Sequence, residues 1–344
     1  MQSSHPPLMV WRIGQTIVWF AGAAILFCLF YFPSLGVLLF WNILIPLAPA
    51  LFVVAPGLWR NVCPLATTVL LPRRAGLSKK KKLSAAQAGK LNLVGVIALY
   101  AIVPLRHAVF NASGTATALL IVSMAFIGVA VGFGYEWKSA WCSGLCPVHP
   151  VEKLYGANVS FSLPNAHCDR CMNCVVPCPD STPNIRPSSS TKTIMHRIGG
   201  ALVVGGLPGF IWGWFHVPDQ AKISMFSSFI SVYAQPLAGL ATTLAVYIFV
   251  SGELRGRSLH KLSRIFAAAG VSCYYWYRIP ALFGFGESGK DGLLVDLKNS
   301  IPGWSMPVMT LTITIFFFYW MAIRKESRKS WIIRPEYAEN IRAR

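Results

Sequence analysis

The sequence is poor in charge, and acidic residues are especially scarce. Only 12% of its 344 residues are charged, and 12 Asp and Glu stand against 31 Lys and Arg, which gives a net charge of +19. A soluble domain carries about 25% charged residues. With 54% hydrophobic residues and a mean hydropathy of +0.52, much of the surface must be solvated by lipid. We therefore expect an all-α integral membrane protein.

Several signatures of catalysis and export are also missing. The sequence contains no serine or cysteine hydrolase constellation and no Gly-rich phosphate loop, and its acidic residues do not pair convincingly for acid–base chemistry. The first apolar run, about 15–32, lacks a clear small-residue cleavage site, so we interpret it as a retained span. Any chemistry is then expected from a bound cofactor, which the protein holds and tunes.

Eight apolar stretches approach the roughly 20 residues that a helix needs to cross the hydrocarbon core. This predicts a polytopic helical bundle of about eight spans. The helix over 37–57 contains three prolines, and we expect it to be kinked and to position Cys63. The stretches are about 13–32, 37–57, 91–110, 116–134, 197–216, 231–250, 265–285 and 304–323.

The basic residues are distributed asymmetrically over the loops. All but five of the 31 Lys and Arg fall on one side of the expected spans, and the positive-inside rule makes that side cytoplasmic. We expect a bacterial inner-membrane protein with both termini in the cytoplasm, and no nucleic-acid partner is needed to explain the charge. The run Lys79–Lys82 is interpreted as a lipid-surface anchor. Three parts follow: N-terminal helices (1–134), a cytoplasmic loop (135–196), and C-terminal helices with a basic tail (197–344).

Most of the nine cysteines lie in the 135–196 loop. Four form a Cys-x2-Cys-x2-Cys-x3-Cys-Pro run, the spacing of bacterial ferredoxins, in which three thiolates cap one cubane cluster and the fourth usually binds another. A zinc site typically shows Cys pairs at longer separation, and disulfides are rare in the cytoplasm. The run therefore predicts an iron–sulfur site at Cys168, Cys171, Cys174 and Cys178.

Two shorter motifs lie upstream. Cys142-x3-Cys146-Pro147 repeats the second half of the ferredoxin run, and Cys63-Pro64 follows an earlier helix pair. We interpret them as a degenerate internal repeat in which Trp59 stands where the first cysteine would be. Since two expected spans separate Cys63 from Cys142, both motifs should emerge on the same side. The alternative for Cys63 is a free thiol at the membrane interface.

The motifs supply seven thiolates, whereas two [4Fe-4S] clusters need eight ligands. One cluster would take Cys168, Cys171, Cys174 and Cys146; the second would take Cys178, Cys142 and Cys63. The alternative is that the second cluster is absent. Cys28 and Cys273 lie in apolar spans and are expected to be free. The eighth ligand is left open among His149, His167, Asp180, a partner residue and solvent.

These motifs resemble the membrane-bound polyferredoxin family around NapH and NosR, with CcoG-type relatives. The resemblance covers about residues 37–180. It implies ferredoxin-like cluster loops on the cytoplasmic face, and it implies electron transfer. The chain departs from the family in having one ferredoxin run and no segment long enough for a flavin domain. Ser113 at the start of a span is interpreted as a helix cap.

A few polar residues near the ends of the expected spans bear on haem and quinone binding. His107 and His216 could contact a quinol, but no histidines have the spacing of a di-haem site, so haem is not expected. Arg278 lies among tyrosines near the end of a span; snorkelling to the interface is the expected role, and an aromatic-lined quinone pocket is the alternative. Four basic residues near the cysteines would raise the cluster potential: Arg60, Lys138, Lys153 and Arg170.

The functional expectation is an electron-transfer subunit of an oxidoreductase complex rather than a stand-alone enzyme. It would carry electrons between a quinol or a cytoplasmic donor and a partner redox enzyme, such as a c-type cytochrome or a quinol-linked enzyme. One alternative is a membrane reductase for metal-cofactor assembly. The other is a structural anchor whose clusters only stabilise a loop. Membrane lipid and other subunits of the complex are the expected partners.

Overall fold

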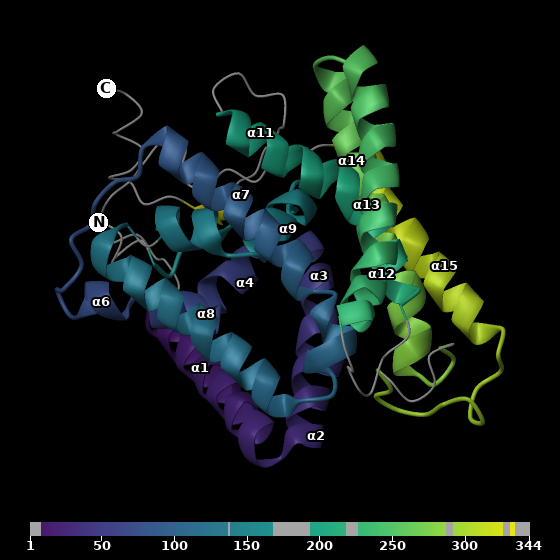
Figure 1. Ribbon diagram of the computed structural model, residues 1–344, viewed down its shortest axis with the longest axis horizontal. Helices are drawn as coiled ribbons and strands as arrows, with labels where there is room; N and C mark the ends of the chain where they lie inside the picture. Colours follow the sequence, from purple (N-terminus) through teal and green to yellow (C-terminus); the bar gives the residue numbers. More distant parts are fainter. Residues whose placement is uncertain are drawn as a thin grey trace.

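Helices make up most of the computed structural model, which describes residues 8–136, 138–167, 193–217, 226–286, 292–325 and 331–333. Seven of its helices are long and apolar enough to cross a membrane, which confirms a polytopic all-α membrane protein. They are Met9–Tyr31, Pro33–Val54, Ala85–Ile102, Gly114–Gly134, Ile194–Phe215, Ile230–Glu253 and Ser305–Ile323. Figure 1 shows α1 and α8 on one side of the bundle and α12–α15 on the other, with α3 and α9 between them.

The second span is irregular, as its prolines predict. A π-helical stretch interrupts it, and Pro49 lies inside its last segment. The helix ends at Ala55 because a residue before proline is disfavoured in the α conformation, and Pro56 starts the next helix. The bounds are α1 Leu8–Tyr31, α2 Pro33–Val37, η1 Leu38–Leu44 and α3 Ile45–Val54.

Three short helices follow, and each has a proline in its first two positions, where the missing N–H costs nothing. They are α4 (Pro56–Val62), α5 (Pro64–Val69) and α6 (Leu71–Arg74). Cys63 is the residue between α4 and α5, with φ −54° and ψ 118°. The turn at Cys63 therefore separates two helices instead of lying in an open loop.

The next helices begin at clear caps. Ser84 and Gln87 form a capping box, and the Ser113 hydroxyl accepts a hydrogen bond from the Ala116 N–H at 3.1 Å. The expected cap at Ser113 is confirmed. These elements are α7 (Ala85–Ile102), η2 (Arg106–Phe110), α8 (Gly114–Gly134), η3 (Lys138–Leu145) and α9 (His149–Tyr155).

The C-terminal half differs from expectation at the stretch 265–285. It lies in α14, a 26-residue helix packed against α12 and α15, but α14 is not among the seven spans. Arg278 and the tyrosines Tyr274, Tyr275 and Tyr277 lie within that stretch and lower its hydropathy. The bounds are α11 Ile194–Ala201, η5 Leu202–Gly206, α12 Leu207–Phe215, α13 Phe226–Glu253, α14 Arg257–Leu282, α15 Ser305–Phe318 and η6 Tyr319–Ile323.

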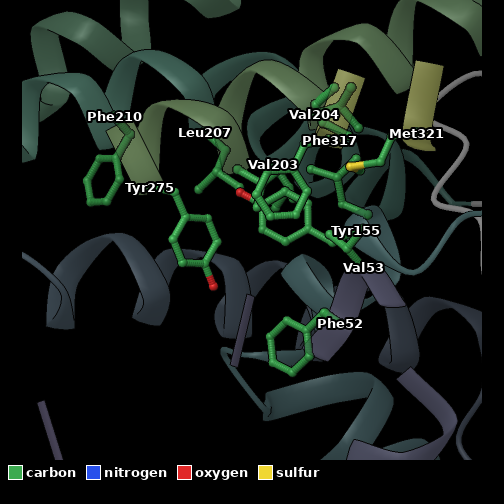
Figure 2. Packing of buried hydrophobic residues seen from close by; sticks show 14 of the residues in the cluster. Phe52, Val53, Tyr155, Val203, Val204, Leu207, Phe210, Tyr275, Phe317 and Met321 are labelled. Carbon is green, nitrogen blue, oxygen red and sulfur yellow. The ribbon is translucent and has the colours of Figure 1, made fainter. Parts of the chain in front are cut away.

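The main core joins segments from the whole length of the chain. Figure 2 shows Phe52, Tyr155, Phe210 and Phe317 among its members, which come from α3, α9, α12 and α15. Because α9 follows the second Cys-Pro motif directly, the core fixes that motif relative to the spans.

Backbone pairing joins the loops at one end of the bundle. The Lys79 N–H donates to the Phe133 carbonyl at 2.8 Å, and the Glu136 N–H donates to the Lys81 carbonyl at 2.9 Å. Two short strands, β1 (Leu163–Pro164) and β2 (Ile332–Ile333), pair in parallel. The lysine run itself is exposed.

Candidate iron–sulfur site

The structure brings three of the seven candidate cysteines together. Cys63, Cys142 and Cys146 belong to one small cluster with Trp141, Val69 and neighbouring apolar side chains. Cys142 is buried and the other two are partly buried, and none of the three forms a disulfide. The remaining candidates, Cys168, Cys171, Cys174 and Cys178, lie outside the described residues.

Two close approaches bring the cysteines into this cluster. A Cβ at Gly95 of α7 would lie 2.7 Å from the Gly144 carbonyl oxygen, so η3 can reach α7 only at a glycine. At the other wall of η3, a Cβ on Gly128 of α8 would come within 3.1 Å of the Trp141 ring. Glycines in two spans thus let the segment carrying Cys142 and Cys146 pack between α7 and α8, opposite α5.

Burial controls the ionisation of these thiols. It raises the pKa of the Cys63 thiol to about 11, assisted by the nearby Cys142 and Glu152 and opposed by the Ala66 N–H. Burial likewise raises the pKa of Cys146 to about 11, with Cys63 contributing and the N–H groups of Val148 and His149 opposing. A metal ligand must be the thiolate, so metal binding here would release the protons that these thiols otherwise hold at neutral pH.

Backbone N–H groups that face the sulfur atoms make Cys63 and Cys146 suitable for iron–sulfur ligation. The N–H groups that face Cys63 and Cys146 stabilise negative sulfur, and hydrogen bonds to sulfur are among the features that set cluster potentials. Among the residues that the structure describes, no group of three His, Cys, Asp or Glu side chains is arranged to hold a single metal ion.

A buried ionic network adjoins the thiols, and the sequence analysis missed its central residue. Glu152 is 1% exposed; its Oε1 lies 3.4 Å from Arg60 Nε and its Oε2 lies 3.0 Å from His149 Nδ1. The i, i+3 spacing of His149 and Glu152 after a Cys-Pro motif was the available signal. The chain has few acidic residues, and this one is placed beside the candidate ligands.

The residues that precede the ferredoxin run are held against α4, which ends next to Cys63. The Asn61 side chain donates to the Pro164 carbonyl at 2.8 Å and accepts from the Ala166 N–H at 3.0 Å. His167 Nε2 lies 3.2 Å from the Arg60 carbonyl oxygen. His167, the residue directly before Cys168, is therefore held against Arg60 of α4, and Arg60 lies three residues before Cys63 in sequence.

The C-terminal segment returns to the same place, which the sequence did not indicate. Trp331 is fully buried, donates to the Gly156 carbonyl at 2.6 Å, and lies under two cations: Arg60 at 6.0 Å and Lys153 at 5.2 Å from the ring centroid. Of the basic residues expected near the cysteines, Arg60 lies close enough to Cys63 to act on its thiol, and Lys153 lies over the Trp331 ring. The side chains of Lys138 and Arg170 lie outside the described residues.

The interfacial assignment of Arg278 was wrong. Arg278 is 3% exposed and donates to the Trp41 carbonyl at 2.8 Å and to Asn42 Oδ1 at 2.7 Å, so it does not snorkel. His107 is also buried, with Nε2 3.0 Å from the Trp214 carbonyl oxygen, whereas His216 is exposed. The polar partners of Arg278 and His107 come from other helices, which is why spacing along one helix did not reveal their burial.

Comparisons of the chain with protein-family models, curated proteins and solved structures find no match. The resemblance to membrane polyferredoxins thus depends on the cysteine motifs alone.

Proposed function

We propose that this protein is a membrane iron–sulfur electron carrier. It exchanges electrons with a quinol or a cytoplasmic donor on one hand and with a partner redox enzyme on the other. Cys63, Cys142 and Cys146 bind [4Fe-4S] clusters together with the four cysteines of the ferredoxin run.

One observation supports this proposal above all. Cys63 comes from a segment 79 residues before Cys142, yet both side chains lie in one cluster with Cys146. A free interfacial thiol would have no reason to lie beside two other thiols and the residue preceding a ferredoxin run. A [4Fe-4S] cluster would supply one-electron exchange here.

The surrounding residues have separate roles. The apolar walls formed by Trp141 and Val69 exclude water from the sulfur atoms. Backbone N–H groups orient and stabilise the thiolates, and the Arg60–Glu152 pair sets the local charge. Burial, hydrogen bonding to sulfur and net charge are the features by which a protein tunes a cluster potential.

Anaerobic iron and acid-labile sulfide analysis, combined with EPR of the reduced protein, tests the proposal. Two cubanes predict about eight irons and about eight sulfides per chain. About four of each would remove the second cluster, and zinc without sulfide would contradict the whole proposal. Redox-inert clusters would show that they only stabilise the loop.

A further inference from the structure

The seven candidate thiolates leave one iron of two [4Fe-4S] clusters without a cysteine ligand. Two histidines adjoin the cysteine motifs in the described part of the chain. His149 follows the Cys142–Cys146 motif, and His167 precedes the ferredoxin run. Both are 3% exposed, so burial does not choose between them. Their contacts do.

A carboxylate fixes the imidazole ring of His149. Its Nδ1 lies 3.0 Å from Glu152 Oε2, and Glu152 Oε1 lies 3.4 Å from Arg60 Nε. An ion pair with Arg60 requires the ionised carboxylate, which only accepts hydrogen bonds, so the proton of the first contact belongs to Nδ1. A metal takes the neutral ring. Nε2 is then the nitrogen whose lone pair can coordinate iron.

This contact matches the usual surroundings of a metal-bound histidine. A ligating imidazole almost always donates its other ring N–H to a carboxylate, a backbone carbonyl or water, which fixes the tautomer and the ring orientation. His149 and Glu152 achieve this within the first turn of α9, because residues at i and i+3 share one face of a helix. The ring is therefore oriented before any metal binds.

Both members of this pair lie next to the candidate sulfur atoms. The His149 N–H faces the Cys146 sulfur, and the Glu152 carboxylate is near enough to raise the pKa of the Cys63 and Cys146 thiols. An acid in this position disfavours the thiolates that a metal site needs. Holding a histidine ligand gives Glu152 a role that offsets this cost.

His167 is held in a different place. Its Nε2 donates to the Arg60 carbonyl oxygen at 3.2 Å, and it lines a cavity shared with residues of α1, α5 and α6. None of the three described candidate cysteines lines that cavity. His149 is therefore the histidine that the described contacts connect to the sulfur atoms.

We propose that His149 is the eighth cluster ligand, binding iron through Nε2 while Glu152 holds the ring through Nδ1. The inference rests on the proposed function, since it requires both [4Fe-4S] clusters. His149 completes the second cluster, whose three thiolates are assigned to Cys63, Cys142 and Cys178. A neutral imidazole in place of a thiolate removes one negative charge, and histidine ligation raises the reduction potential of an iron–sulfur cluster.

Pulsed EPR of the full-length protein, purified anaerobically and reduced, tests this proposal through the nitrogen bound to iron. The wild type should show a strong nitrogen coupling that changes when histidine alone carries the heavy nitrogen isotope, which distinguishes imidazole from backbone nitrogen. His149→Cys should lose this coupling and keep about eight irons, because a thiolate replaces the imidazole. One of its two clusters should have a lower midpoint potential than in the wild type.

The matched control is His167→Cys, which makes the same exchange at the other buried histidine and should keep the coupling and potentials of the wild type. Wild-type protein that binds clusters without a histidine coupling would overturn this inference and leave the proposed function standing. So would a coupling that survives in His149→Cys or disappears in His167→Cys. The labelled wild type gives this answer even if a variant fails to fold. Wild-type protein without iron and sulfide would contradict the proposed function itself.

Discussion

The carboxylate of Glu152 lies between the guanidinium of Arg60 and the imidazole of His149, and all three side chains are more than nine-tenths buried. Removing one partner of a buried ion pair leaves an uncompensated charge, which costs more than the pair contributes when intact. Since the Glu152 carboxylate also lies close enough to Cys63 and Cys146 to raise the pKa of both thiols, and Arg60 opposes it at Cys63, the network connects the stability of the α4–α9 contact to the thiols.

Glu152→Ala should therefore destabilise the protein by about 3–5 kcal/mol, measured as a lowered midpoint in denaturant or heat unfolding in detergent. Glu253→Ala, at the exposed end of α13, is the control and should change stability by less than about 0.5 kcal/mol. Equal stability of the two variants would mean that the buried network contributes nothing.

Cys63→Ala tests whether this cysteine is a ligand. If the second cluster needs it, the variant should lose roughly half of its iron and sulfide and one set of EPR signals, while the first cluster remains. Cys28→Ala is the matched control because Cys28 is a free cysteine in α1, and it should keep the full metal content. Full iron in Cys63→Ala would remove position 63 from the ligand set.

At the scale of elements, the position of η3 against α7 depends on the absence of a side chain at Gly95. The contact there is with a backbone carbonyl, Gly144 O, which cannot rotate away as a side chain can. A methyl group would force α7 and η3 apart, and Cys142 and Cys146 would move with η3. The candidate site therefore depends on a glycine one element away from its cysteines.

Gly95→Ala should destabilise the protein by about 1–3 kcal/mol, the usual cost of overpacking, and should lower iron content in cells. Gly252→Ala in α13 introduces the same methyl group where nothing lies within 4 Å. It should be neutral or stabilising because alanine favours the helix. Unfolding midpoints of the two variants provide the comparison, and equal midpoints would show that η3 adjusts without cost.

At the scale of the molecule, segments from both halves of the chain meet at one end of the bundle. The Cys63 turn, the η3–α9 segment and the strand at Ile332–Ile333 gather there. Residues 294–300, most of them exposed, lie between α14 and α15, beyond the end of α14 that is distant from Arg257. The arrangement separates a cysteine-bearing end from an opposite end without candidate ligands in the described residues.

Thiol labelling checks this arrangement in membranes. Lys80→Cys and Arg255→Cys should react with an impermeant maleimide only from the cytoplasmic side, because the basic loops stay inside. Ser300→Cys lies beyond α14 and reports on that helix: reaction only from outside means that α14 crosses the membrane, and reaction only from inside means that it does not. All three positions are exposed, so accessibility is limited by the membrane. Labelling of positions 80 and 255 from opposite sides would contradict the single-sided site.

The cysteine spacing and the apolar runs were sufficient to predict a helical membrane protein and to single out Cys63, Cys142 and Cys146. Local sequence determines these features, since a span needs a continuous apolar run with internal backbone hydrogen bonds. The spacing of the ferredoxin run is likewise a local property. The prediction of eight spans was one more than the seven helices that qualify, because the apolar stretch of α14 also contains Arg278 and several tyrosines, which lower its hydropathy.

Only the tertiary structure decided which distant residues meet. The grouping of Cys63 with Cys142 and Cys146, the burial of Glu152 and Arg278, and the return of Trp331 beneath Arg60 all depend on how separate helices pack. Hydropathy and spacing describe one segment at a time. Packing is decided by the fit of side chains and by glycines such as Gly95, at which a neighbouring backbone approaches too closely for any other residue.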